Sequence, residues 1–152
     1  MRRASFTLGC AITLLACRQG GGVTGPRLEA ALGATFANLV HLQLGALGLP
    51  SLPAGALRVR TTCRKIGAEA ASSGAGDWSC SLFWFGPDRR GKSVEARTPL
   101  EDVFEVSVGA DGCYTATAGA ESHLGGPTLQ AASGATVVNL VYAFDGCFDT
   151  TP

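Results

Sequence analysis

Hydrophobic residues recur along the chain at two spacings, and each spacing predicts one kind of element. After Pro26, apolar side chains return every three or four residues, which is the period of an amphipathic helix. Thr24 or Gly25 can cap this helix and Pro26 suits its first turn, whereas the segment Gly45–Gly48 marks its end. The predicted apolar stripe consists of Leu28, Leu32, Phe36, Leu39 and Val40. Such a stripe has to pack against another element.

Farther along, the pattern changes to alternation, which is typical of half-buried strands. Polar residues alternate with core-type residues from Leu57 to Arg64 and again from Asp77 to Phe85. Further strands are expected at residues 93–98, 103–108, 113–118 and 137–144. We therefore predict a single α+β domain, in which an N-terminal amphipathic helix packs on an antiparallel sheet of four to six strands.

The first residues of the chain resemble the signal peptide of a bacterial lipoprotein. Arg2 and Arg3 precede a short apolar run, which ends in Leu14-Leu15-Ala16-Cys17. This ending resembles the lipobox, and the resemblance implies cleavage before Cys17 and lipidation of its side chain. The run is too short to span a bilayer, which takes about 20 helical residues. The alternative is an ordinary secreted protein that is cleaved nearby.

This ending divides the chain into a signal peptide at 1–16, a glycine-rich flexible tether at 17–25 and the single α+β domain at 26–150. The whole chain has 12 basic and 12 acidic residues. Removal of the signal peptide takes away Arg2 and Arg3 and no acidic residue, which leaves a net charge near −2. We expect no nucleic-acid partner, because no basic stripe is present, and we expect contact with the membrane through the lipid anchor.

Four cysteines remain in the predicted domain, and an even number in an exported domain indicates disulfides. The hydrophobic faces of two strands coincide when Cys63 lies opposite Cys80, whereas a slip of one residue would place arginines on the core side. Cys113 and Cys147 each follow an Asp-Gly turn and are left for each other. These spacings lack the close pairs of a zinc site, so we expect no metal site and no cofactor.

The same register determines which residues meet on the face that points away from the core. It places Arg58 opposite Phe85 and Arg60 opposite Phe83. Such pairs can form cation–π contacts, and an exposed face of this kind would suit a protein partner or an anionic glycan. The alternative is that the arginine stems simply cover the phenylalanines, or that another element buries them. These four residues are the candidate binding face.

No catalytic motif in the sequence is convincing. Gly86–Ser93 matches a phosphate-binding loop by letter, but Pro99 leaves little room for the helix that such a loop requires. A small secreted hydrolase that uses loop residues around Ser72 and His123 is the alternative to a binding function. We expect a protein that is not an enzyme.

Three carboxylates, Glu101, Asp102 and Glu105, cluster near the start of a predicted strand. One interpretation is a carboxylate pair for acid–base chemistry. The more common arrangement is a solvated strand edge, where charges discourage aggregation. We expect the solvated edge.

Several motifs together resemble a group of small secreted lipoproteins of high-GC actinobacteria. They are Leu14–Cys17, Pro26–Gly33, Thr35–Leu39, Gly76–Cys80, Asp111–Ala116 and Phe144–Asp149. Some of these relatives carry the automatic label of transporter permease, whereas this sequence has no later segment long and apolar enough to span a membrane. The resemblance implies a location on the extracytoplasmic face of the cell membrane. We expect a membrane-anchored, non-enzymatic binding module for an envelope protein or glycan, or alternatively an accessory lipoprotein of an envelope transporter.

We predict that Cys17 is the first residue of the mature protein and carries the lipid. A lipid with at least two chains would give stable anchoring, which one chain does not. Mass spectrometry of the N-terminal peptide from native membranes should find a lipidated peptide that begins at Cys17. An unmodified peptide that begins elsewhere would contradict the prediction.

Overall fold

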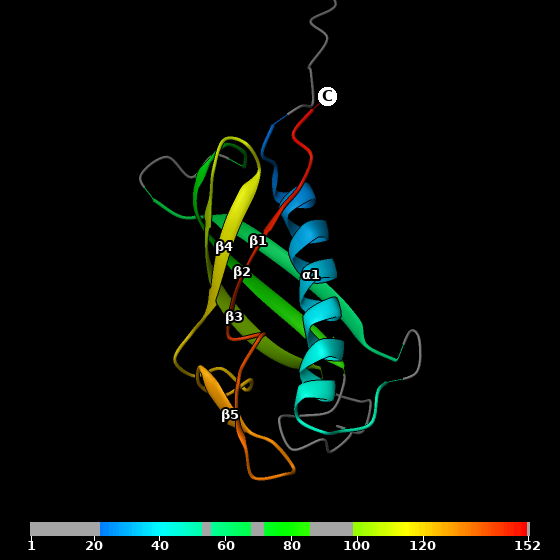
Figure 1. The fold of residues 1–152 in the computed structure, drawn as a ribbon. Coiled ribbons are helices and arrows are strands. Elements are labelled where there is room, and N and C mark those ends of the chain that lie inside the picture. The colour runs from blue at the N-terminus through cyan, green and yellow to red at the C-terminus, as the bar shows by residue number, and fades with distance from the viewer. Residues whose placement is uncertain (1–21, 53–55, 68–71, 86–98, 152) are drawn as a thin grey trace, which may run out of the picture.

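One long helix lies across one face of a twisted antiparallel sheet (Figure 1). The computed structural model describes residues 22–52, 56–67, 72–85 and 99–151. The helix, α1, covers Gly25–Ala46. The main sheet has the order β1-β2-β3-β4-β7, with β1 at Arg58–Lys65, β2 at Gly76–Phe85, β3 at Leu100–Val108, β4 at Cys113–Ala118 and β7 at Ala143–Cys147. A small second sheet pairs β5, Thr128–Gln130, with β6, Thr136–Val138. The predicted α+β class, with a helix on an antiparallel sheet and two disulfides, is confirmed.

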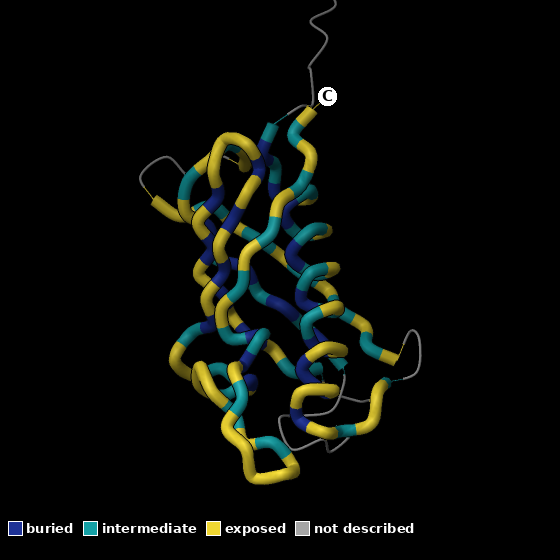
Figure 2. The backbone as a smooth tube through the Cα atoms, in the orientation of Figure 1, coloured by how far each residue is buried: buried dark blue, intermediate teal, exposed yellow. Residues whose placement is uncertain are grey.

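The helix follows its predicted pattern. Thr24 is the N-cap residue, with an extended backbone, and Pro26 lies in the first turn. At the other end the Leu47 N–H donates to the Gln43 carbonyl, and Gly48 follows with a positive φ of 72°. The buried apolar residues of α1 are Leu28, Leu32, Phe36, Val40 and Leu44. Figure 2 shows this buried side of the helix facing the sheet.

The core is centred on the ring of Phe36. It packs edge-on against Trp84 of β2 and Phe104 of β3, with ring centroids 5.8 Å and 6.1 Å away. Phe104 in turn contacts Phe144 of β7 at 5.5 Å. Phe36 and Phe104 are fully buried, and burying one such side chain stabilises the fold by about 1.5–3 kcal/mol. One helix residue therefore joins the helix to the middle of the sheet.

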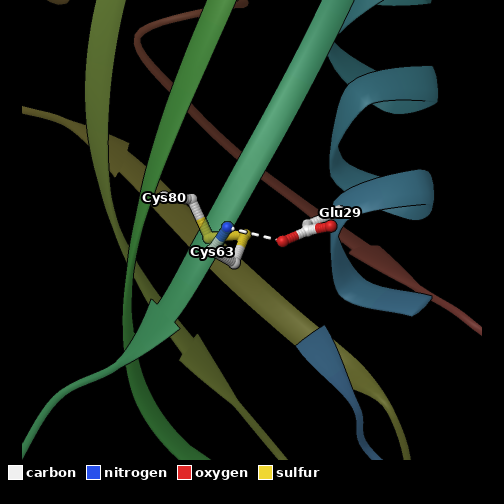
Figure 3. Close-up of a disulfide and its surroundings, with 3 residues drawn as sticks. All are labelled: Glu29, Cys63 and Cys80. Atoms are coloured by element: carbon white, nitrogen blue, oxygen red, sulfur yellow. Dashed lines mark hydrogen bonds between the residues drawn. A yellow bond between two sulfur atoms is a disulfide. The ribbon is translucent and has the colours of Figure 1, made fainter. Parts of the chain in front are cut away.

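The helix approaches β1 closely at Gly33. A Cβ atom on this glycine would lie 2.9 Å from Thr61 Oγ1. One turn earlier, Glu29 Oε1 accepts a hydrogen bond from the backbone N–H of Cys63 at 2.8 Å (Figure 3). Glycine weakens a helix by about 1 kcal/mol relative to alanine, and here it makes room for the strand.

Both predicted disulfides form, and they lie on opposite faces of the sheet. Cys63–Cys80, with Cα atoms 4.1 Å apart, joins β1 to β2 on the core side. Cys113–Cys147, with Cα atoms 3.9 Å apart, joins β4 to β7 on the exposed side. The register predicted between the first two strands is confirmed along the whole pair. Because β1 and β7 are the edges of the sheet, each disulfide fastens an edge strand, which stabilises by roughly 3–4 kcal/mol on the chain-entropy model.

The prediction of one last strand at residues 137–144 is wrong. The chain forms β6, turns, and enters the main sheet only at β7. Asn139 causes this break: its buried side chain donates to the carbonyls of Leu124 and Gly126, and its own carbonyl accepts from the Tyr142 N–H. A buried amide needs such partners, and satisfying them bends the chain out of a strand.

Several predicted features lie outside the described residues. They include the signal peptide, Cys17, the strand expected at 93–98 and the segment Gly86–Ser93. Of the expected tether, only residues 22–25 are described, and Val23 among them is buried in the domain. In the described parts of the chain no helix is long and apolar enough to cross a membrane.

The first and last described segments lie side by side at one end of α1 (Figure 1). Gly22 N donates to the Thr150 carbonyl at 2.6 Å. The Arg27 guanidinium donates to the carbonyls of Asp149 at 3.1 Å and Thr151 at 2.8 Å. Thr151 also donates twice to the Asp149 carboxylate, which lowers the pKa of that group. The two ends of the domain are therefore joined directly.

We predict that Gly112→Ala destabilises the protein more than Gly134→Ala. Both glycines have a positive φ, 83° and 84°, where a side chain costs roughly 1–2 kcal/mol. A Cβ atom on Gly112 would also collide with the Phe148 carbonyl oxygen and lie 2.7 Å from Thr150 Cγ2, whereas nothing lies within 4 Å at Gly134. Urea unfolding should show a loss of about 1 kcal/mol for Gly134→Ala and at least about twice that for Gly112→Ala. Equal losses would contradict the role of this close contact.

Candidate functional site

The face of the sheet opposite α1 is open to solvent. Along β3, Glu101, Val103 and Glu105 are exposed, whereas the residues between them are buried beneath the helix. The same alternation continues along β4, where Thr115 and Thr117 are exposed. Buried and exposed residues alternate visibly along these strands in Figure 2. Within the described ranges of the chain, no element covers this face.

The predicted arginine and phenylalanine pairs form on this face, beside the sheet edge. Arg58 lies opposite Phe85 and Arg60 opposite Phe83, as the register predicted. The Cζ atom of Arg58 lies 5.0 Å from the ring centroid of Phe85, within the distance of a cation–π contact. Both arginines are exposed and both phenylalanines are half-buried. We call these four residues the Arg–Phe cluster.

Positive and negative side chains lie on different strands of the open face. Arg64 extends the row of arginines along β1, whereas Glu101 and Glu105 lie on β3. Glu101 is paired with Phe83 and Glu105 with Ser79, so β2 separates the arginines from these carboxylates. Among the described residues, no ion pair joins an arginine to a carboxylate. The arginines and the carboxylates therefore lie on separate strands of the open face.

The three carboxylates that were predicted as one cluster separate onto the two faces of β3. Glu101 and Glu105 are on the open face, whereas Asp102 is buried on the face toward α1. The solvated-edge interpretation is therefore wrong for Asp102, because this side chain is buried. None of the three carboxylates lies at an edge of the sheet, because β3 is an interior strand. The missed signal was alternation: Asp102 stands two positions before Phe104 and four before Val106, which are both buried.

Asp102 holds the loop that follows β4. Its Oδ1 accepts from Ser122 Oγ and from the His123 backbone N–H, each at 2.7 Å, and its Oδ2 accepts from Trp84 Nε1 at 2.8 Å. The His123 ring stays 56% exposed, with Nδ1 3.0 Å from the Glu101 carbonyl oxygen and 3.7 Å from Asp102 Oδ1. Three donors thus satisfy a carboxylate that is buried, and the loop is tied to the core.

These groups do not form a nucleophile and base. A serine nucleophile needs its hydroxyl hydrogen-bonded to a base such as imidazole. Ser122 Oγ instead donates to Asp102 and accepts from the Leu124 N–H at 3.1 Å. Ser72 precedes β2, whereas His123 lies beside the start of β3, which pairs with the far end of β2. The structure therefore does not bring Ser72 and His123 together.

No group of three or more His, Cys, Asp or Glu residues is placed to hold a metal ion within the part of the chain that the structure describes.

Comparisons of the chain with protein-family models, with curated proteins and with solved structures give no match. The Arg–Phe cluster on the open face is the candidate site that the geometry favours.

We predict that Asp102→Ala destabilises the protein strongly and that His123→Ala does not. Without the carboxylate, Trp84 Nε1 and the two loop donors lose their acceptor, and each buried unsatisfied donor costs about 1–3 kcal/mol. Truncating the exposed His123 ring should change the free energy of unfolding by about 0.5 kcal/mol or less. Urea unfolding of the two variants measures the difference. An unchanged Asp102→Ala protein would show that other contacts hold the loop.

Proposed function

We propose that the protein is a membrane-anchored binding module outside the cytoplasm, whose open sheet face binds an acidic surface of another envelope protein. The observation that carries this proposal is the Arg–Phe cluster, in which two exposed arginines stand beside two half-buried phenylalanines. Arginine and aromatic residues are enriched among the few interface residues that supply most of the binding energy. An anionic glycan is the competing ligand for the same face.

The two described grooves on this side of the sheet do not point to a small-molecule ligand for the Arg–Phe cluster. Small molecules bind in hollows that bury most of their surface. One groove on the open face is lined by Asp77 and Glu105, and another, beside the loop after β4, by Glu101 and Glu121. Neither groove includes a residue of the Arg–Phe cluster.

The lipobox-like ending supports the membrane anchor. Cys17 lies five residues before Gly22, the first residue that the structure describes. A chain of that length spans at most about 18 Å, at roughly 3.3–3.6 Å per residue. A lipid on Cys17 would therefore hold the domain close to the membrane. An accessory lipoprotein beside an envelope transporter is one form that such a module can take.

We predict that the double variant Arg60→Ala/Phe83→Ala weakens partner binding at least about 30-fold, because truncating interface hot spots costs about 2 kcal/mol or more. Cross-linking in native membranes identifies the partner, and titration with the captured protein measures the affinity. Arg60 is exposed and Phe83 is half-buried. The double variant should therefore lose only about 1 kcal/mol of folding stability.

The matched control is Thr115→Ala/Thr117→Ala, which changes the same face away from the cluster and should bind normally. Binding that survives the cluster variant would overturn the proposal. A cluster variant that unfolds would do the same, because the four residues would then belong to the core. A captured ligand that resists protease and disappears on glycan digestion would assign the face to an anionic glycan.

A further inference from the structure

We propose that the edge of β1 receives an added strand from the partner, an extended segment whose side chains alternate between apolar and acidic. The inference rests on the proposed function and names the chemistry of the partner at the same site. It follows from three features of β1: an open row of backbone groups, a groove beside them and the arginines on the outer face.

The backbone of β1 has an open edge. The strand stands at the end of the sheet order, and the Cys63 N–H points away from β2 to reach Glu29. In an antiparallel pair the direction of the backbone groups alternates, so the N–H and C=O groups of Val59 and Thr61 also point away from β2. Among the described residues no hydrogen bond satisfies these four groups. Directional groups in such a row match another extended backbone.

A groove of about 500 Å³ lies beside these backbone groups, between α1 and β1. On the helix side it is lined by Ala30, Gly33, Ala34 and Ala37. The Glu29 side chain is long enough to reach the strand edge, whereas the alanine side chains and the glycine are too short. No described residue therefore hydrogen-bonds to the edge at Val59 and Thr61. Neighbouring strands lie about 4.8 Å apart, and small residues on α1 leave the space that an added strand needs.

The inner and outer faces of the β1 edge favour different side chains in the added strand. In an added strand, alternate residues point to opposite faces of the sheet. Those on the inner face would meet Ala30, Ala34 and Ala37, which favours apolar side chains. Those on the outer face would lie opposite Arg58 and Arg60, which favours Asp or Glu, because opposite charges across a strand pair attract.

The arginines also argue against a second copy of this chain as the occupant. Pairing two β1 edges would bring Arg58 and Arg60 of one copy beside the arginines of the other. Like charges directly opposite each other on paired strands are destabilising. Natural proteins place charges on edge strands to prevent such self-association. An acidic segment from another protein relieves the repulsion that a second copy would create.

The test uses the mature protein and a labelled synthetic peptide, Glu-Val-Glu-Val-Glu-Val-Glu. Fluorescence anisotropy should show saturable binding, and the matching Lys-Val peptide should bind at least about tenfold more weakly. N-methylation of one alternate set of peptide amides should abolish binding, because only one set faces β1, whereas N-methylation of the other set should not. Equal binding by the two methylated peptides, or no binding by the parent peptide, overturns the proposal.

Substitutions in the protein test the same site independently of changes to the peptide. Ala34 is exposed on α1, so Ala34→Leu should fill the groove, leave thermal unfolding unchanged and weaken the peptide at least about tenfold. Ala46→Leu, at an exposed position near the end of the helix, is the control and should bind normally. Arg60→Glu should reverse the preference, so that the Lys-Val peptide binds better. If Ala34→Leu binds the peptide as the wild type does, the groove is not its site.

Two variants, Arg60→Ala/Phe83→Ala and Ala34→Leu, distinguish strand addition at β1 from binding at the Arg–Phe cluster alone. If Arg60→Ala/Phe83→Ala loses the cross-linked partner and Ala34→Leu keeps it, the face binds a partner without strand addition. If neither variant loses the partner, both proposals fail. Sedimentation at increasing concentration adds a further outcome: a dimer that Ala34→Leu abolishes would make a second copy the occupant and overturn the choice of an acidic segment.

Discussion

The pairing of Cys63 with Cys80 fixes the register of β1 on β2, and both faces of the sheet depend on that register. On the inner face it brings Val59 beside Trp84, which contacts Phe36 of the helix. On the outer face it creates the Arg–Phe cluster. A slip by one residue would exchange the two faces of β1, burying arginines and exposing its apolar residues. The core and the candidate site are therefore consequences of one constraint.

This register can be predicted from the sequence, because the alternation over the eight residues of β1 and the pairing of two cysteines require the same alignment of β1 with β2. The helix is predictable for a similar reason, since its apolar stripe from Leu28 to Val40 continues over more than three turns. The burial of Asn139 and Asp102 could not be predicted in the same way. Each is a polar residue whose partners come from distant parts of the chain, and the local pattern does not contain those partners. Alternation with Phe104 and Val106 indicates an inward position for Asp102, but a buried carboxylate is expected only once its three donors are known.

These two buried polar residues have a common effect on the fold. Asp102 holds the start of the loop after β4 and Asn139 holds its end, at Leu124 and Gly126. Together they let an irregular segment pack against the end of the sheet without leaving its polar groups unsatisfied. The cost is that the chain cannot continue as a strand through Asn139. The small sheet of β5 and β6 is the structure that forms instead.

The position of the cluster relative to the chain ends is consistent with the proposed anchor. Gly25 lies near Cys63, and Gly74 bonds to Val23, so the N-terminal end of α1 sits beside the end of β1 and the start of β2. Phe85 ends β2, which has 10 residues and a rise of about 3.3 Å per residue. The Arg58–Phe85 pair therefore lies roughly 30 Å along the sheet from the end that would carry the lipid. A short tether would bring that end to the membrane while the cluster and the open part of the β1 edge remain accessible to a partner.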